Sequence, residues 1–164
     1  ALSCGGTSSM NNTYLHSPNW PDTYNYANTC TMTISRPDGV CQLRMDFKTF
    51  DLAQPGTTGQ CTDDQFTVTG ERQFTYLCGQ TPANWHFYLD VNMQANPTEF
   101  KFTTSATSFN RRFRIKISMI PCSQEIPSGC GQYFKENTGM IHSFNYGSYY
   151  LAGLNYGICF RKNK

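Results

Sequence analysis

The sequence CTDDQFTVTGERQFTYLC, residues 61–78, predicts two strands joined by a tight turn. Phe66 and Val68 alternate with threonines, which is the two-residue period of a strand with one apolar face. The Gly70-Glu71 pair predicts the chain reversal, and residues 74–76 resume the alternation. A cysteine stands at each end, so a disulfide between the two would clamp the open ends of this hairpin.

The same alternation recurs along the chain up to residue 122, and no window there shows a convincing helical period. Short strands separated by turn residues are typical of an antiparallel β-sandwich. Aromatic residues make up 15% of the chain, which suits half-buried pleated surfaces better than helices. The apolar residues that define the other strands are Cys30, Met32 and Ile34; Cys41, Leu43, Met45 and Phe47; Phe87, Leu89 and Val91; Phe100 and Phe102; and Phe113, Ile115, Ile117 and Met119.

The chain has 164 residues and eight cysteines, none of them in a CxxC pair. This pattern argues against zinc knuckles and thioredoxin-like redox chemistry, and for four structural disulfides made in an oxidising compartment. We therefore expect a secreted, extracellular protein. The net charge of +2 is too small to predict nucleic acid or an anionic membrane as partner. No apolar run is long enough for a membrane span, and residues 1–15 lack signal-peptide features, so we expect a mature secreted chain.

Several motifs occur in a fixed order between residues 4 and 122. They are Cys4-Gly5-Gly6; Ser17-Pro18-Asn19-Trp20-Pro21 with Tyr24 and Cys30; Leu43-Arg44-Met45-Asp46-Phe47 with Phe50-Asp51-Leu52; Cys61-Thr62-Asp63-Asp64; Leu77-Cys78-Gly79; and Phe113-Arg114-Ile115-Lys116-Ile117. In this order they resemble the CUB domain family of extracellular β-sandwiches. Trp20 stands where the family usually has Tyr, and Met32 where it often has Trp. The resemblance implies a disulfide-stapled, CUB-like jelly roll that takes part in extracellular protein–protein interaction.

Eight cysteines allow 105 pairings, and three arguments select among them. The resemblance implies two of the pairs. The third joins the start of one strand to the end of the last, since these can be neighbours in an antiparallel sheet. The fourth comes from the internal repeat described below. The expected disulfides are Cys4–Cys30, Cys61–Cys78, Cys41–Cys122 and Cys130–Cys159.

The resemblance also raises the question of a metal ion. Many CUB domains bind Ca²⁺ through a Glu before the third cysteine, an Asp three residues after it and a later Asp. Asp64 matches the first Asp, but Ala53 stands at the Glu position and Ser105 at the later Asp. Ca²⁺ takes six to eight oxygen ligands with several carboxylates, so we expect no stoichiometric site and no other cofactor. A weak ion gathered by Asp51, Asp63 and Asp64 is the alternative.

The last part of the chain resembles its beginning. MIHSFNY at residues 140–146 resembles YLHSPNW at residues 14–20, and each motif lies between two cysteines at similar spacing. We therefore predict a CUB-like domain over 1–122, a linker over 123–129 and a short, β-rich, incomplete second CUB-like unit over 130–164. A chain cleaved from a longer protein, or a sequence that ends where the ordered structure ends, would also show an incomplete second unit.

The final 35-residue range, 130–164, is rich in aromatic residues but too short to form a stable core alone. Its few strands would also leave unpaired edges. We expect it to be ordered by packing on its own domain, on the rest of a longer chain or on a neighbouring molecule by β-augmentation. The partner would be an extracellular protein or the chain itself. In the second case the chain would be a structural extracellular protein that self-assembles through this incomplete unit into a homo-oligomer or filament. The interaction candidates are Tyr133, Phe134, Phe144, Tyr146, Tyr149 and Tyr150.

No catalytic motif of serine hydrolases, zinc metalloproteases or P-loop proteins occurs. His16 and His142 occupy equivalent repeat positions, which favours a structural role, so we expect no enzyme activity. A non-catalytic region of a longer secreted trypsin-like protease is a further alternative, because CUB modules often accompany such proteases. Asn11 begins a glycosylation sequon and is the expected glycan site.

Arg112, Arg114 and Lys116 fall on one face of a predicted strand. Such a stripe would suit a polyanion such as a sulfated glycan. A solvated outer face would give the same pattern, and that is the interpretation we expect to hold.

Overall fold

The computed structural model describes residues 1–162 and is almost entirely β-structure. No helix in this range is long and apolar enough to cross a membrane. The elements are β1 (Thr7–Ser8), β2 (Thr13–His16), β3 (Asn28–Ile34), β4 (Val40–Asp51), β5 (Asp64–Val68), β6 (Trp85–Asp90), β7 (Thr98–Thr104), β8 (Arg112–Pro121), a short 3₁₀ turn (Cys122–Gln124), β9 (Cys130–Phe134) and β10 (Gly157–Phe160).

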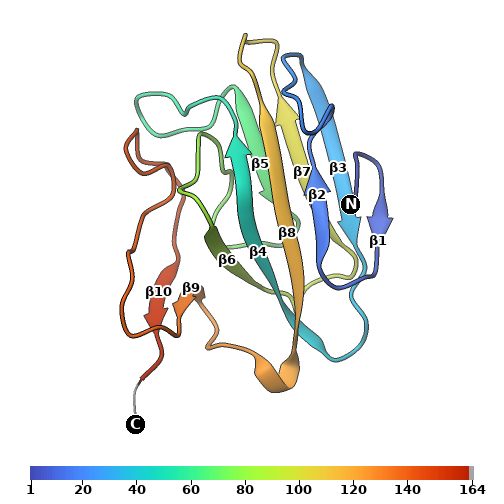
Figure 1. Cartoon of the computed structure of the whole chain (residues 1–164), viewed down its shortest axis with the longest axis vertical. Coiled ribbons are helices and arrows are strands. Elements are labelled where there is room, and N and C mark those ends of the chain that lie inside the picture. The colour runs from blue at the N-terminus through green and yellow to red at the C-terminus, as the bar shows by residue number, and fades with distance from the viewer. Residues whose placement is uncertain (163–164) are drawn as a thin grey trace.

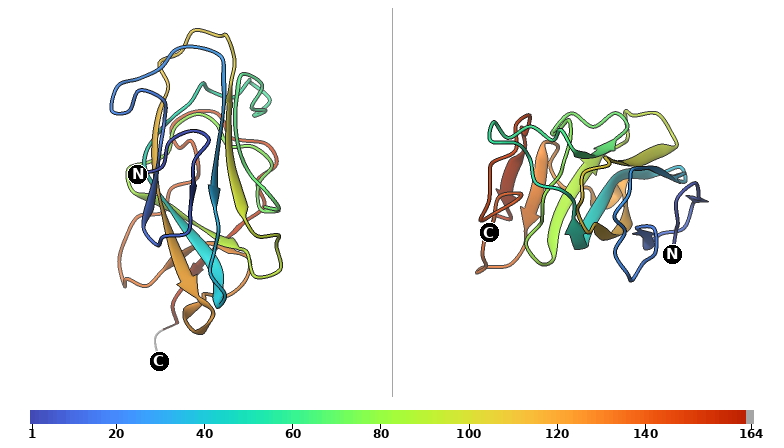
Figure 2. Two further views of the ribbon diagram at one scale, coloured as in Figure 1. Left: turned by 90° about the vertical axis from the view of Figure 1, so that its right-hand side faces the viewer. Right: turned by 90° about the horizontal axis from the view of Figure 1, so that it is seen from above.

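Two four-stranded sheets form the body of the molecule (Figure 1, Figure 2). One has the order β2-β8-β4-β6 and the other β1-β3-β7-β5. All pairings within them are antiparallel except that of β1 with β3. The antiparallel β-sandwich expected from the sequence is therefore confirmed.

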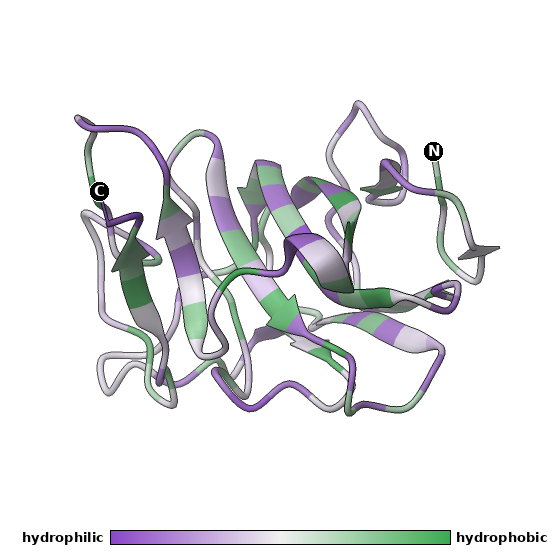
Figure 3. Ribbon diagram, turned by 90° about the horizontal axis from the view of Figure 1, so that it is seen from below, coloured by the Kyte–Doolittle hydropathy of each residue, from purple (hydrophilic) through white to green (hydrophobic). Residues whose placement is uncertain are grey.

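Period-two alternation creates the core between the sheets. Figure 3 shows hydrophobic and hydrophilic residues alternating along the strands. In β8, Phe113 and Ile115 are fully buried while Arg114 between them is partly exposed. The ring of Phe113 stacks on that of Phe102 from β7, with centroids 3.7 Å apart. Aromatic stacking thus joins the two layers directly.

Four disulfides hold the described chain, and none of its cysteines is free. Two join neighbouring strands or their ends, one clamps the segment around β5, and one lies in the C-terminal segment. They are Cys4–Cys30, Cys41–Cys122, Cys61–Cys78 and Cys130–Cys159, the pairs that the sequence analysis expects.

The expected hairpin at residues 61–78 forms only in part. Its first arm is β5, but the second arm contributes a single bridge, in which Phe66 and Leu77 exchange two backbone hydrogen bonds of 2.8 Å. Phe74 is buried and Tyr76 is exposed, so they do not share a face as predicted. The continuous partner of β5 is β7, which pairs along its whole length on the other edge.

Two short strands, β1 and β2, form where the alternation is too brief to predict a strand. β2 pairs with β8 over four residues, and Leu15 within it is fully buried. β1 runs parallel to β3 just after the Cys4–Cys30 disulfide. Their existence depends on partners about 20 to 100 residues away in the chain, not on local sequence.

The C-terminal segment, residues 130–162, lies against the sandwich beside β6 (Figure 1). β9 and β10 form a parallel pair joined by Cys130–Cys159. Residues 123–129, expected as a linker, also contact the body: Ile126 is buried, its N–H donates to Gln42 Oε1 (2.9 Å) and its carbonyl accepts from Gln42 Nε2 (3.0 Å). Whether these residues divide two domains stays a prediction.

Candidate interaction surface

Phe144 attaches the C-terminal segment to the sandwich. Its side chain is only 2% exposed, and its ring lies 5.2 Å from Trp85, 5.6 Å from Phe50 and 6.1 Å from Phe47 between centroids. All three contacts are edge-to-face, the geometry that aromatic quadrupoles favour. Of the three places where the segment could pack, its own domain is the one observed. Phe144, expected as an interaction residue, is therefore part of the core.

Asn145 fixes the turn that follows. It adopts a left-handed conformation with φ 59°, which Asn tolerates better than most residues. Its Oδ1 accepts from the N–H of Gln80 (2.9 Å), and its Nδ2 donates to Gln54 Oε1 and the Tyr149 carbonyl (both 2.9 Å). A Cβ at Gly79 would lie 2.3 Å from Asn145 Oδ1, so this close approach requires the glycine.

The sequence repeat is also a repeat of local structure. Asn19 and Asn145 both have positive φ, 62° and 59°. In each turn the N–H three residues further on donates to the asparagine carbonyl, at 2.7 and 3.1 Å. In each turn a histidine packs against the following aromatic residue, with centroids 5.3 Å apart at Trp20 and 4.7 Å at Tyr146. The histidines thus have packing roles in both copies.

Three of the predicted interaction residues lie on the surface around this turn. Tyr146 is 68% exposed, Tyr149 53% and Tyr150 84%. The other two, Tyr133 and Phe134, are half-buried on β9. Because Phe144 and Asn145 anchor the turn, the backbone that carries these tyrosines is held against the sandwich. We call Tyr146, Tyr149 and Tyr150 the tyrosine surface.

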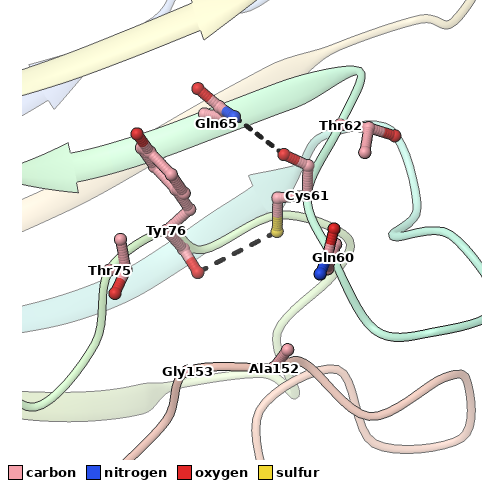
Figure 4. A pocket seen from close by; sticks show the side chains of 8 residues that line it. All are labelled: Gln60, Cys61, Thr62, Gln65, Thr75, Tyr76, Ala152 and Gly153. Atoms are coloured by element: carbon pink, nitrogen blue, oxygen red, sulfur yellow. Dashed lines mark hydrogen bonds between the residues drawn. The ribbon is translucent and has the colours of Figure 1, made fainter.

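A hollow of about 460 Å³ lies beside the tyrosine surface, where the Cys61 segment meets Ala152 and Gly153 (Figure 4). The N–H of Ala152 donates to the carbonyl of Gly59 (2.7 Å), which holds the two segments together. The lining is uncharged and rich in amides and hydroxyls, so it can hydrogen-bond neutral polar groups such as peptide units. Its polar side chains are Gln60, Thr62, Gln65, Thr75 and Tyr76.

His86 connects β6 to β9. Its Nε2 accepts the N–H of Tyr133 (3.0 Å), and its carbonyl accepts from Gln132 Nε2 (3.2 Å). The acceptor role requires an unprotonated Nε2. Burial, followed by the nearby Arg44 guanidinium, lowers the pKa of His86 to about 4. This histidine is therefore neutral at physiological pH and serves as a structural acceptor.

Asp64, the metal-ligand candidate, is completely buried with Arg111. Arg111 Nε donates to Oδ2 (2.7 Å) and Nη2 to Oδ1 (3.0 Å), a bidentate ion pair. The N–H groups of Ala53 (2.8 Å) and Ser105 (3.2 Å) also donate to this carboxylate. These are the two positions where the family resemblance would place the other carboxylate ligands.

The residues present do not fit a calcium ion. Both oxygens of Asp64 already accept from N–H donors, and the rest of the Arg111 fork donates to the carbonyls of Thr107 (2.8 Å) and Phe109 (3.2 Å). A divalent cation at Asp64 would lie against a buried guanidinium, and like charges in a low-dielectric site repel strongly. No cluster of three or more metal-binding side chains occurs within residues 1–162.

Comparison with known families agrees with this architecture. The family model of the CUB domain matches residues 4–117, and that of the animal CUB domain matches residues 127–164. Cubilin of dog (Canis lupus familiaris) is 28% identical over 152 residues, which is 90% of this chain and 4% of that protein. Pig (Sus scrofa) cubilin is 27% identical over 154 residues, 91% of this chain and 4% of that protein. The chain thus spans about 4% of the length of these curated relatives.

Solved structures share the fold. The full extracellular region of zebrafish Gpr126/Adgrg6 superposes with a TM-score of 0.59 at 21% identity, covering 73% of this chain and 15% of that one. The MASP-1 CUB2 domain bound to Ca²⁺ superposes with a TM-score of 0.56 at 19% identity, covering 70% of this chain and 98% of that one.

Proposed function

This chain belongs to the CUB domain family, and on that basis we propose that it is a secreted, non-catalytic module that binds another extracellular protein through the tyrosine surface. CUB domains are non-catalytic modules typical of extracellular protein interaction. The four disulfides support an oxidising compartment. The observation that carries the proposal is the exposure of three tyrosines on a turn held in place by buried residues.

Tyrosine is suited to this role for physical reasons. Its ring supplies a large apolar contact with few rotatable bonds, and its hydroxyl can hydrogen-bond at the rim of an interface. Residues held in a fixed conformation before binding lose less entropy when they bind. The uncharged hollow beside the turn could accept the backbone of a partner protein.

A site-specific cross-link tests the proposal. We would replace Tyr150 with the photo-reactive p-benzoylphenylalanine and, as a matched control, replace Met93, which is 89% exposed on a distant loop. Both proteins would be irradiated in extracellular fluid from the source tissue. We expect a discrete adduct from position 150 that is absent from position 93. The Tyr146→Ser, Tyr149→Ser double variant should lower its yield. The same set of adducts from both positions would contradict a specific surface.

Self-assembly is a second candidate, supported by β10. This strand ends the two-stranded sheet, so one backbone edge has no partner strand within residues 1–162. Ile158 and Phe160 on it are exposed, Phe160 by 58%. Sedimentation velocity at micromolar concentration would detect assembly. Assembly should be reduced by Ile158→Ser with Phe160→Ser and unchanged by Met10→Ser, which removes an even more exposed apolar residue elsewhere.

We also propose that the chain divides at residues 123–129 into a CUB unit and the beginning of a second one. The two family matches, to 4–117 and 127–164, and the repeated asparagine turn support this division. The alternative is that the chain is a non-catalytic region of a longer secreted protease. Measuring the mass of the native protein and of its precursor tests this alternative. A precursor carrying a C-terminal protease domain would favour it.

A further inference from the structure

The outer face of β8 carries three cations without an acidic partner. Arg112, Arg114 and Lys116 are partly exposed, and the residues between them are buried, so all three side chains project from the same face. Within residues 1–162 the only ion pairs closer than 4.0 Å are Arg44–Asp46 and Arg111–Asp64. None of the three cations therefore forms an ion pair with a carboxylate of the described chain.

Two acidic residues lie on the adjacent strand, but neither neutralises this stripe. Asp46 is opposite Lys116 in the β4–β8 register, and its Oδ1 is occupied by Arg44 through Nε (3.2 Å) and Nη2 (3.1 Å). Asp51 is opposite Arg112 without forming an ion pair. Lys48, exposed on β4, adds a further positive charge nearby.

Aromatic side chains hold the two guanidinium groups in place. Arg114 lies 4.3 Å above the ring of Tyr14, and its Nε donates to His16 Nε2 (3.3 Å). Arg112 lies 5.8 Å from the ring of Trp20, and the ring of His16 stacks on that tryptophan. Burial and the charge of Arg114 lower the pKa of His16, which favours the neutral acceptor form. Guanidinium groups held this way lose little freedom when they bind an anion.

The arrangement selects a class of ligand. Alternate residues on a strand are about 6.6–6.8 Å apart, so the stripe offers three evenly spaced charges to an extended polyanion. The planar fork of arginine matches sulfate and carboxylate groups. Tyr14 and Trp20 are partly exposed, so the parts of their rings that Arg114, Arg112 and His16 do not cover offer apolar surface to sugar rings. In the extracellular compartment proposed above, a sulfated polysaccharide is a polymer with these properties.

We propose that the outer face of β2 and β8, formed by Tyr14, Arg112, Arg114 and Lys116 together with Trp20 from the turn after β2, binds a sulfated glycosaminoglycan. The proposal departs from the solvated outer face expected from the sequence, because the three cations form no ion pair within residues 1–162 and two of them lie against aromatic rings. The surface is separate from the tyrosine surface, so the two can be tested independently.

Calorimetry with a heparin octasaccharide tests the proposal on the full chain. The Arg114→Gln, Lys116→Gln double variant removes two charges from the stripe. The control, Arg72→Gln with Lys101→Gln, removes two exposed charges away from it, with Lys101 on β7 of the other sheet. We expect the first variant to weaken binding about tenfold or more and the control to weaken it by less than about threefold, with an affinity that falls as salt rises. Circular dichroism would verify that both variants fold.

Three outcomes would overturn the proposal. The wild-type chain could fail to bind the octasaccharide at physiological salt. Both double variants could lose affinity equally, which would indicate diffuse charge and no defined site. A single-stranded oligonucleotide of equal charge could bind as tightly as the octasaccharide, which would indicate a general polyanion surface or a nucleic-acid partner.

Discussion

Arg111 determines the chemistry around Asp64, because its guanidinium is the cation that pairs with this buried carboxylate. The buried carboxylate is fully hydrogen-bonded, and its cation is supplied by the chain. Removing one member of a buried ion pair leaves the other charged and unsolvated. The family resemblance shows that two carboxylate ligands for calcium are missing. It does not show that Arg111, 47 residues from Asp64 in the chain, supplies the positive charge instead.

We predict that Arg111→Met destabilises the protein by about 3–5 kcal/mol, because Asp64 is left as an unpaired buried charge. Urea unfolding would measure this loss. The double variant Arg111→Met, Asp64→Leu should recover part of it, since no uncompensated charge remains. Arg72→Met, at an exposed position, is the control and should change stability by less than about 0.5 kcal/mol. A loss no larger than that of the control would refute the role assigned to the pair.

We predict that Ca²⁺ does not bind stoichiometrically, because Arg111 occupies the oxygens of Asp64. Thermal unfolding should therefore give the same midpoint in Ca²⁺ and in a chelator. Calorimetry provides the direct measurement. A one-to-one titration in the micromolar range that disappears in Asp64→Asn would show the prediction to be wrong.

We predict that acid weakens the contact between β9 and β6 through His86. Its pKa is lowered from 6.5 to about 4 in the folded chain, so between these values only the unfolded chain takes up the proton. The stabilisation is fully present above pH 6.5 and is lost as the pH falls toward 4, by up to about 3 kcal/mol. The charged groups facing the ring are Arg44, Asp46 and Glu136.

Unfolding by urea across this pH range, compared between wild type and His86→Gln, would isolate the effect. Glutamine keeps a hydrogen-bond acceptor but does not titrate, so its stability curve should be flatter between pH 6.5 and 4. His142→Gln is the control, because His142 lies near the surface with its carbonyl, not its ring, bound to Trp85 Nε1 (3.0 Å). Parallel curves for wild type and His86→Gln would count against the prediction.

At the scale of elements, the two asparagine turns share a conformation but differ in what they support. Asn145 makes three side-chain hydrogen bonds to the sandwich and its own turn, whereas Asn19 is exposed. The two turns can therefore be compared directly. The Asn145 turn attaches the C-terminal segment to the sandwich, whereas the side chain of Asn19 makes no such attachment.

We predict that Asn145→Ala costs about 2–4 kcal/mol, from lost hydrogen bonds and a strained left-handed backbone. Asn19→Ala should cost only about 1–2 kcal/mol, because the strain of the left-handed backbone is then the sole source of the loss. Hydrogen exchange would show faster opening of residues 140–155 in Asn145→Ala and not in Asn19→Ala. Asn145→Gly, which tolerates the positive φ, separates the two contributions. Equal losses in both alanine variants would contradict the docking role.

At the scale of the whole molecule, Phe144 makes the C-terminal segment part of one core. The cluster around it includes residues of β4 and β6, and a chain truncated after Cys122 would expose that cluster to water. Assembly of such a fragment would reflect the uncovered core. It would not show whether the intact chain associates through its C-terminal segment. Point substitutions on β10 are therefore the better test of self-assembly.

We predict that Phe144→Ala lowers the stability of the entire chain by about 3–5 kcal/mol. Because the residue packs on Trp85, tryptophan fluorescence and far-ultraviolet circular dichroism should report the same shifted midpoint, as expected of one cooperative unit. Tyr150→Ala, on the same segment but exposed, should have almost no effect on stability. Separate transitions for the two signals would mean that the segment unfolds independently.

The sequence by itself determined the features that depend on local periodicity. Alternation in residues 41–50 and 112–119 predicts β4 and β8 because one buried face requires a two-residue period. The asparagine turns follow from a short motif that occurs twice. The exposure of Tyr146, Tyr149 and Tyr150 did not follow from sequence, since the buried Phe144 belongs to the same aromatic-rich stretch.

Only the tertiary structure decided the features that depend on distant partners. The second arm of the 61–78 hairpin forms one bridge to β5, whereas β7, from a later part of the chain, pairs with β5 along its whole length. Arg111 belongs to no local pattern, yet folding buries it against Asp64. The cationic stripe is visible in the sequence, but its aromatic support comes from β2, about 100 residues earlier. Such contacts carry no local signal because they arise from packing between segments that the chain brings together only on folding.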